Sequence, residues 1–152
     1  MKKFEFTGET KTISLFFRTA TLHRIRAVAE FGLVKIGDLG GWIEKEENLS
    51  HEGKAWVWGN AEVWGNAKVF SASHVLVIGA IGSRDDFTTF FRDKDNEITV
   101  KCGCFLGKID KFLEKVTQTH GDSKYALVYK AAVEVARLQI DLSGEAPKDA
   151  DE

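Results

Sequence analysis

The sequence has little of several features that would point to a special environment. It contains one proline and two cysteines, and no apolar run is long enough to span a bilayer. The formal net charge of −2 lacks the basic excess of a general nucleic-acid binder. Cys102 and Cys104 are poorly spaced to bond each other, and the start MKKFEF has no signal-peptide h-region. We therefore expect a soluble protein of a reducing, cytoplasmic compartment.

What the sequence does contain is a hexapeptide repeat between Gly53 and Ile78. Small residues recur every six positions, each followed two positions later by valine and then by a large apolar residue. The small residues are Ala55, Ala61, Ala67 and Ser73, and the valines are Val57, Val63, Val69 and Val75. Strand residues two apart point the same way, and Gly-Asn pairs supply the positive φ angles of tight corners. Since a six-residue period excludes a helix, we predict a short left-handed parallel β-helix.

If alanine and valine point inward, the large aromatic residues of the repeat point outward. These residues are Trp56, Trp58, Trp64 and Phe70. Outward aromatic side chains on a short solenoid are rarely left in water. They are covered by flanking segments or by another subunit, or they form a ligand platform. We expect an oligomer interface here, in a trimer or a multiple of a trimer.

The flanks of the repeat predict further strands and two helices. "KTISLFFRT" and "TLHRIRAV" read as N-terminal strands, and "FTTFFRD" with "ITVKCGCF" reads as a hairpin. One apolar stripe predicts a helix that ends at Gly121, and a second helix follows Asp122 as its N-cap. The expected fold is α+β: N-terminal strands, a short β-helix, a β-hairpin and two helices. We expect a β segment over residues 1–78, a hairpin and helix module over 79–142, and a disordered acidic tail over 143–152.

The stretch from Leu22 to Gly121 resembles hexapeptide-repeat proteins encoded by phages and prophages. The resemblance is carried by "LHRIRA", then "KIGDLGGWIE", then "NLS", then the repeated Ala-x-Val-aromatic-Gly-Asn units, and by the segment from "IGAIGSRDD" to "KVTQTHG". It implies a phage protein acting in the cytoplasm of an infected bacterium. This chain departs from the family in having very few repeats, which argues against a filament.

The turn "GAIGSR" is the most site-like element. Gly82 exposes backbone N–H groups, Ser83 adds a hydroxyl and Arg84 a planar cation, a set that suits phosphate or carboxylate. The competing interpretation is a structural turn with a solvated arginine, because short glycine motifs are unspecific. Further candidate ligand-binding residues are Thr88, Thr89, Arg92 and Lys101 on the hairpin, with Arg24 and Arg26 across a fold or subunit boundary.

The pattern gives little support to catalysis, and we expect no metal and no cofactor. Cys102, Cys104 and His120 fall short of the four spaced ligands of a zinc site, and alternation predicts that both thiols are buried. His74 could act as a base at a subunit seam, but it has no evident orienting partner.

Three classes of function follow from these residues. The first is a phage anti-defence protein that sequesters an anionic, nucleotide-type immune signal without chemistry, with arginines holding phosphates and aromatic rings stacking a base. The second is a protein-interaction module that inhibits a host defence protein or forms part of a virion. The third, ranked last, is an enzyme of acyl or phosphoryl transfer.

Overall fold

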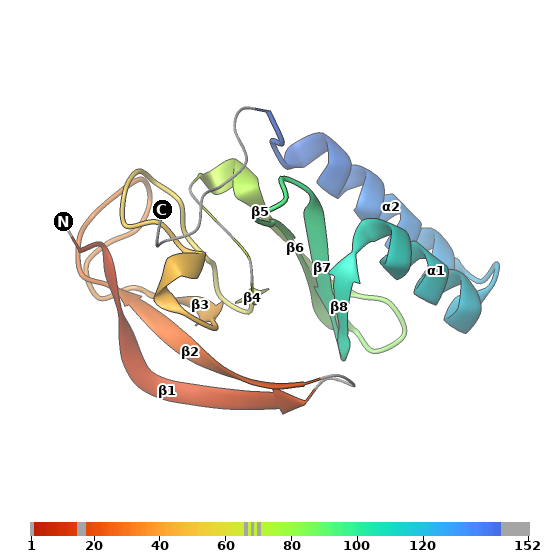
Figure 1. Ribbon diagram of the computed structural model, residues 1–152, viewed down its shortest axis with the longest axis horizontal. Helices are drawn as coiled ribbons and strands as arrows, with labels where there is room; N and C mark the ends of the chain where they lie inside the picture. Colours follow the sequence, from red (N-terminus) through yellow and green to blue (C-terminus); the bar gives the residue numbers. More distant parts are fainter. Residues whose placement is uncertain (1, 15–17, 66, 68, 70, 144–152) are drawn as a thin grey trace.

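The computed structural model describes residues 2–14, 18–65, 67, 69 and 71–143. These residues form two four-stranded sheets and two α-helices (Figure 1). The first sheet consists of β1 (Phe4–Ser14), β2 (Thr19–Ala27), β3 (Leu39–Ile43) and β4 (Glu62–Val63). The second consists of β5 (Val75–Ile81), β6 (Asp86–Arg92), β7 (Ile98–Cys102) and β8 (Phe105–Lys108). The helices are α1 (Ile109–His120) and α2 (Lys124–Gln139), with short 3-10 turns η1 (Glu46–Asn48) and η2 (Ala72–His74).

Both sheets follow the chain order, so each strand pairs with the next one. In the first sheet β1, β2 and β3 are antiparallel, and β4 joins β3 in parallel. The second sheet is antiparallel throughout, with β5, β6, β7 and β8 side by side. The predicted hairpin corresponds to β6 and β7, and the two predicted helices are confirmed as α1 and α2. The N-cap of α2 is Ser123, one residue after the expected Asp122.

The predicted left-handed parallel β-helix is wrong. Of the described repeat residues before β5, only Glu62 and Val63 form a strand. The rest of the repeat lies alongside the segment that precedes it, with backbone bonds from Gly41 N to Val57 O and from Val69 N to Asn48 O. A β-helix satisfies its backbone groups by stacking coil on coil. This repeat is little more than one coil long, so the glycine-rich segment before it supplies those partners instead.

The expectation that the small and valine positions of the repeat point inward is confirmed in its first three units, whereas Ser73 and Val75 of the fourth are half-buried. The fully buried positions are Ala55, Val57, Ala61, Val63, Ala67 and Val69. These side chains fill the core beneath the first sheet together with Leu22, Ile25 and Ile43 of β2 and β3. The small and valine positions therefore face the core without a solenoid, but not as a strict alternation, because Trp56 and Trp64 beside them are buried as well.

The expectation that the tryptophans point outward is wrong for two of them. Trp56 and Trp64 are each 1% exposed, whereas Trp58 is 53% exposed, and Phe70 lies outside the described residues. The ring of Phe31 packs edge-on against Trp56 at 5.3 Å. Segments of the same chain thus cover these rings, which was one of the alternatives for the aromatic face.

The second sheet is packed on both faces. Phe90 and Val100 join the core formed with α1 and α2, whereas Phe91 on β6 joins the core of the first sheet. Figure 1 shows the second sheet between the two helices and the N-terminal strands. The expected boundary after residue 78 falls inside β5, and of the expected tail, 143–152, all but Ser143 lies outside the described residues.

Candidate functional site

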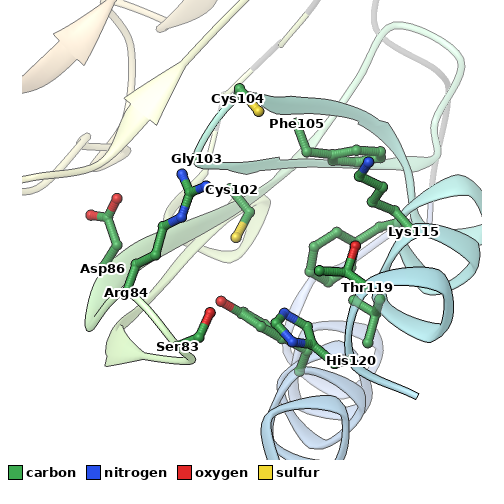
Figure 2. A pocket seen from close by; sticks show the side chains of 13 residues that line it. Ser83, Arg84, Asp86, Cys102, Gly103, Cys104, Phe105, Lys115, Thr119 and His120 are labelled. Carbon is green, nitrogen blue, oxygen red and sulfur yellow. The ribbon is translucent and has the colours of Figure 1, made fainter.

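A cavity of about 170 Å³ opens where the second sheet meets α1. The turn after β5 forms one wall, the turn between β7 and β8 a second, and α1 with one side chain of α2 the third (Figure 2). Its lining residues are Ser83, Arg84, Asp86, Cys102, Gly103, Cys104, Phe105, Phe112, Lys115, Val116, Thr119, His120 and Tyr129. The predicted turn, with Ser83 and Arg84, therefore lies at a cavity.

Gly82 brings this turn against α2. Its φ angle is +79°, and a Cβ at this position would overlap the hydroxyl oxygen of Tyr129. Both the backbone conformation and the space therefore demand glycine here. The turn and Tyr129 fit together only because residue 82 has no side chain, and that fit sets where Ser83 and Arg84 stand.

Aromatic and sulfur groups form the inner wall of the cavity. Tyr129 packs edge-on against Phe112 and is stacked with His120, with ring centroids 5.7 Å apart in both pairs. Thr88 donates a hydrogen bond to the Cys102 Sγ at 3.4 Å. Burial, and then the neighbouring Cys102, raise the pKa of Tyr129 to about 12, so its hydroxyl remains a neutral phenol near pH 7.

The rim of the cavity carries two cations, Arg84 and Lys115. Among the described residues, neither Arg84 nor Lys115 forms an ion pair or a side-chain hydrogen bond. Asp86 is the one carboxylate among the lining residues. Figure 2 shows Arg84 extending from its turn toward Gly103, with Lys115 across the cavity near Phe105. The cavity thus combines an apolar floor with a net positive rim.

The hairpin residues expected to join Arg84 serve other purposes. Thr89 is buried and accepts a hydrogen bond from the Glu62 backbone at 3.2 Å. Lys101 is buried, pairs with Glu62 at 3.3 Å, and lies 5.3 Å from the Trp64 ring centroid. Thr88 lies beneath the cavity, bonded to Cys102. Thr89 and Lys101 thus contact Glu62 of the repeat segment and line a separate cavity on that side of the second sheet, distinct from the one beside Arg84.

The three remaining arginines lie away from the cavity. Arg24 pairs with Glu9 at 3.6 Å, and Arg26 pairs with Glu5 at 2.6 Å, both between β2 and β1. Arg92 is buried, and burial lowers its pKa. Of the predicted ligand-binding set, the described structure brings Ser83 and Arg84 to the cavity, with Gly82 packed against Tyr129 beside it and Thr88 behind its wall.

Sequence reasoning missed the helical half of the site. Lys115 and Thr119 lie four residues apart on one side of α1, and Tyr129 comes from α2. The four-residue spacing was visible in the sequence, but nothing local says which side of α1 faces the hairpin. The expectation that both thiols are buried is wrong for Cys104, which is exposed, while Cys102 is half-buried.

This arrangement of side chains adds no support for a metal site. Cys102, Cys104 and His120 all line the cavity, yet the described residues include no cluster of three or more side chains able to hold a metal ion. Across the described part of the chain, no helix is both long and apolar enough to cross a membrane. No protein-family model matches this chain, and neither does any curated protein.

Proposed function

We propose that this chain is a binding protein that holds one end of an anionic, nucleotide-type ligand in the cavity beside Arg84 and releases it unchanged. The observation that carries the proposal is the pair of cations, Arg84 and Lys115, that face an aromatic cavity without acidic partners among the described residues. An unpaired cation at a concave site binds anions more readily than one already neutralised by a carboxylate.

The chemistry of the lining fits both parts of a nucleotide. The guanidinium of Arg84 can hold two phosphate oxygens at once, and Lys115 adds a second charge from the other side. The ring of Phe105 offers a face for stacking a base. A cavity of about 170 Å³ is smaller than the pockets that enclose whole ligands of this size. It therefore takes a phosphate or a base, and the rest of the ligand lies outside.

Capture rather than turnover is supported by the state of the titratable groups. Tyr129, with its pKa near 12, is a hydrogen-bonding phenol and not a base at neutral pH. The half-buried thiol of Cys102 accepts a hydrogen bond from Thr88.

The biological setting of the proposal rests on the resemblance to phage hexapeptide-repeat proteins. In that setting, the ligand is an immune-signalling nucleotide, and the protein acts as a sponge in the cytoplasm of the infected bacterium. The second candidate is a module that binds a host protein. It is favoured by a separate observation, the exposure of Leu33, Ile36, Leu39 and Trp58 on the N-terminal part of the chain.

The test is a titration of purified protein against cyclic dinucleotides, cyclic oligonucleotides and ADP-ribose derivatives, followed by heat denaturation and chromatography. Depletion of one ligand, with its intact recovery after heating, is the expected result. Depletion with an altered product would contradict capture and favour the transferase alternative. If no nucleotide is depleted, the proposal fails, and a pull-down of host proteins tests the second candidate.

A further inference from the structure

A cavity of about 410 Å³, the second cavity, lies between the second sheet and the N-terminal part of the chain, whereas the first cavity is the one beside Arg84. The walls of the second cavity come from β1, from the repeat segment around Glu62, and from β6 and β7. Thr89 lines it, whereas its neighbour Thr88 lies behind the wall of the first cavity. Because successive residues of a strand point to opposite faces, the two cavities lie on opposite faces of the second sheet.

The two cavities meet at one end of the second sheet. Asp86 at the start of β6 and Gly103 in the turn between β7 and β8 line both of them. The Nη1 atom of Arg84 lies 3.6 Å from the position that a Cβ of residue 103 would take, and Figure 2 shows Arg84 reaching toward Gly103. The carbonyl oxygen of Gly103 accepts a hydrogen bond from the side chain of Lys101, which lines the second cavity. A group held by Arg84 therefore lies at the boundary between the two cavities.

The two cavities differ in the charge of their linings. The lining of the first cavity has two cations and one carboxylate, which leaves it net positive. In the second cavity, Lys11 and Lys101 both pair with Glu62, at 2.7 and 3.3 Å, and the carboxylate of Asp86 balances the second lysine. A phosphate is therefore attracted to the first cavity, whereas the charge-balanced second cavity suits an uncharged polar group.

The second cavity also offers the groups that recognise a nucleobase. The ring of Phe87 is 38% exposed and lines the cavity, and it is held against Gly79, where a Cβ would overlap it. An aromatic ring held in place in this way is a platform on which a planar base stacks. The side chain of Asn60 forms no hydrogen bond with the described residues, and its amide can both donate to and accept from the edge of a base.

We infer that the second cavity holds the nucleoside of a nucleotide whose phosphate lies beside Arg84 in the first cavity. The inference rests on the proposed function and gives a place to the part of the ligand that the first cavity cannot enclose. A volume of about 410 Å³ lies within the range of roughly 300–1,000 Å³ found for pockets that enclose small organic ligands. The ligand passes from one cavity to the other beside Gly103, which has no side chain.

The test is isothermal titration with ribose 5-phosphate and with AMP, GMP, CMP and UMP, which add a base to the same sugar phosphate. The wild type should bind at least one mononucleotide about 10-fold more tightly than ribose 5-phosphate, because a base stacked on an aromatic ring contributes an effect of this order. Phe87→Ala should lose this gain and still bind ribose 5-phosphate like the wild type, which also shows that the variant is folded. The control is Phe6→Ala, which removes a ring of matching exposure, 37%, that lines neither cavity and should keep the gain.

Failure of this inference can be told apart from failure of the proposed function. Asn60→Ala changes an exposed residue and should weaken the same mononucleotide without weakening ribose 5-phosphate, so the inference does not depend on one variant. If ribose 5-phosphate binds the wild type but not Arg84→Ala, and no mononucleotide binds more tightly, the anion site stands and the second cavity holds no nucleoside. Equal affinities of Phe87→Ala and the wild type for the mononucleotide would also overturn the inference. If neither ribose 5-phosphate nor any nucleotide binds the wild type, the proposed function itself is wrong.

Discussion

The N-terminal part of the chain and the cavity beside Arg84 use their cations in opposite ways. In the first part, Arg18, Arg24 and Arg26 each pair with a glutamate. The ring of Trp42 lies beneath Arg24, and that of Trp64 lies beneath Arg18. At the cavity, Arg84 and Lys115 have no acidic partner among the described residues. Charge in the first part stabilises the fold, whereas charge at the cavity remains available to a ligand. The predictions below test this contrast from the largest expected effect to the smallest.

The largest effect is expected from two tryptophans that stand two residues apart in the repeat. Trp56→Ala should lower the free energy of unfolding by about 3–5 kcal/mol, because it empties a fully buried site. Trp58→Ala removes a half-exposed ring, so it should change the free energy of unfolding by only about 0.5 kcal/mol. Urea denaturation of both variants measures the difference. Equal losses would contradict the burial of Trp56 inside a single chain.

A smaller loss of stability is expected when a substitution at Gly82 pushes the turn after β5 away from α2. Gly82→Ala must strain a φ angle of +79° and displace the Tyr129 hydroxyl, so we expect a loss of about 2–3 kcal/mol. Gly37→Ala is the matched control. Its φ angle is +92°, but a Cβ there would meet no atom within 4 Å, so it should lose only about 1 kcal/mol. If thermal denaturation finds the same loss for both, the contact between Gly82 and Tyr129 does not constrain the turn.

The paired charges of the N-terminal part should give a pH signature. Glu44 accepts bonds from Arg18 at 2.6 and 2.8 Å and from the Gly65 backbone at 2.7 Å, and these partners hold its pKa below the usual 4.5. This contribution to stability is fully present above pH 4.5 and is lost as the pH falls through the lower folded pKa. Glu44→Gln should cost about 1–2 kcal/mol at pH 7 and less in acid. A constant difference between the variant and the wild type from pH 7 to pH 3 would argue against this ion pair.

The smallest effect on stability is expected at the cavity itself. Arg84→Ala removes an exposed side chain without an ion-pair partner among the described residues, so the free energy of unfolding should change by no more than about 0.5 kcal/mol. Chemical denaturation next to the wild type measures this change. A loss above 1.4 kcal/mol, which is a tenfold change in the unfolding equilibrium, would mean that Arg84 is part of the structural framework.

Local periodicity made part of this fold predictable. The inward valines and alanines, the hairpin of β6 and β7, and both helices followed from patterns two, three or four residues long. The β-helix failed because it depends on stacking between coils, and a single coil cannot show from its own sequence what it will stack on. The same limit explains Trp56, whose cover includes Phe31, a residue far outside the repeat.

The candidate site, like the fold, could be predicted only in part from the sequence. The turn with Ser83 and Arg84 was predictable, because glycine, hydroxyl and guanidinium stand together in the sequence. Lys115 and Tyr129 were not, since their place depends on how two helices dock on a sheet. Nor could the sequence tell that Arg24 and Arg26 are neutralised, because their partners lie on the neighbouring strand β1.

The most direct test of the contrast is isothermal titration of the wild type, Arg84→Ala and Arg26→Ala with the nucleotide that the panel identifies. We predict that Arg84→Ala weakens binding about 10- to 100-fold, the worth of hydrogen bonds to a charged group, while Arg26→Ala binds like the wild type because its guanidinium already pairs with Glu5. If both variants bind like the wild type, or if Arg26→Ala alone loses binding, the ligand does not use the cavity beside Arg84, and the account given for this site is wrong.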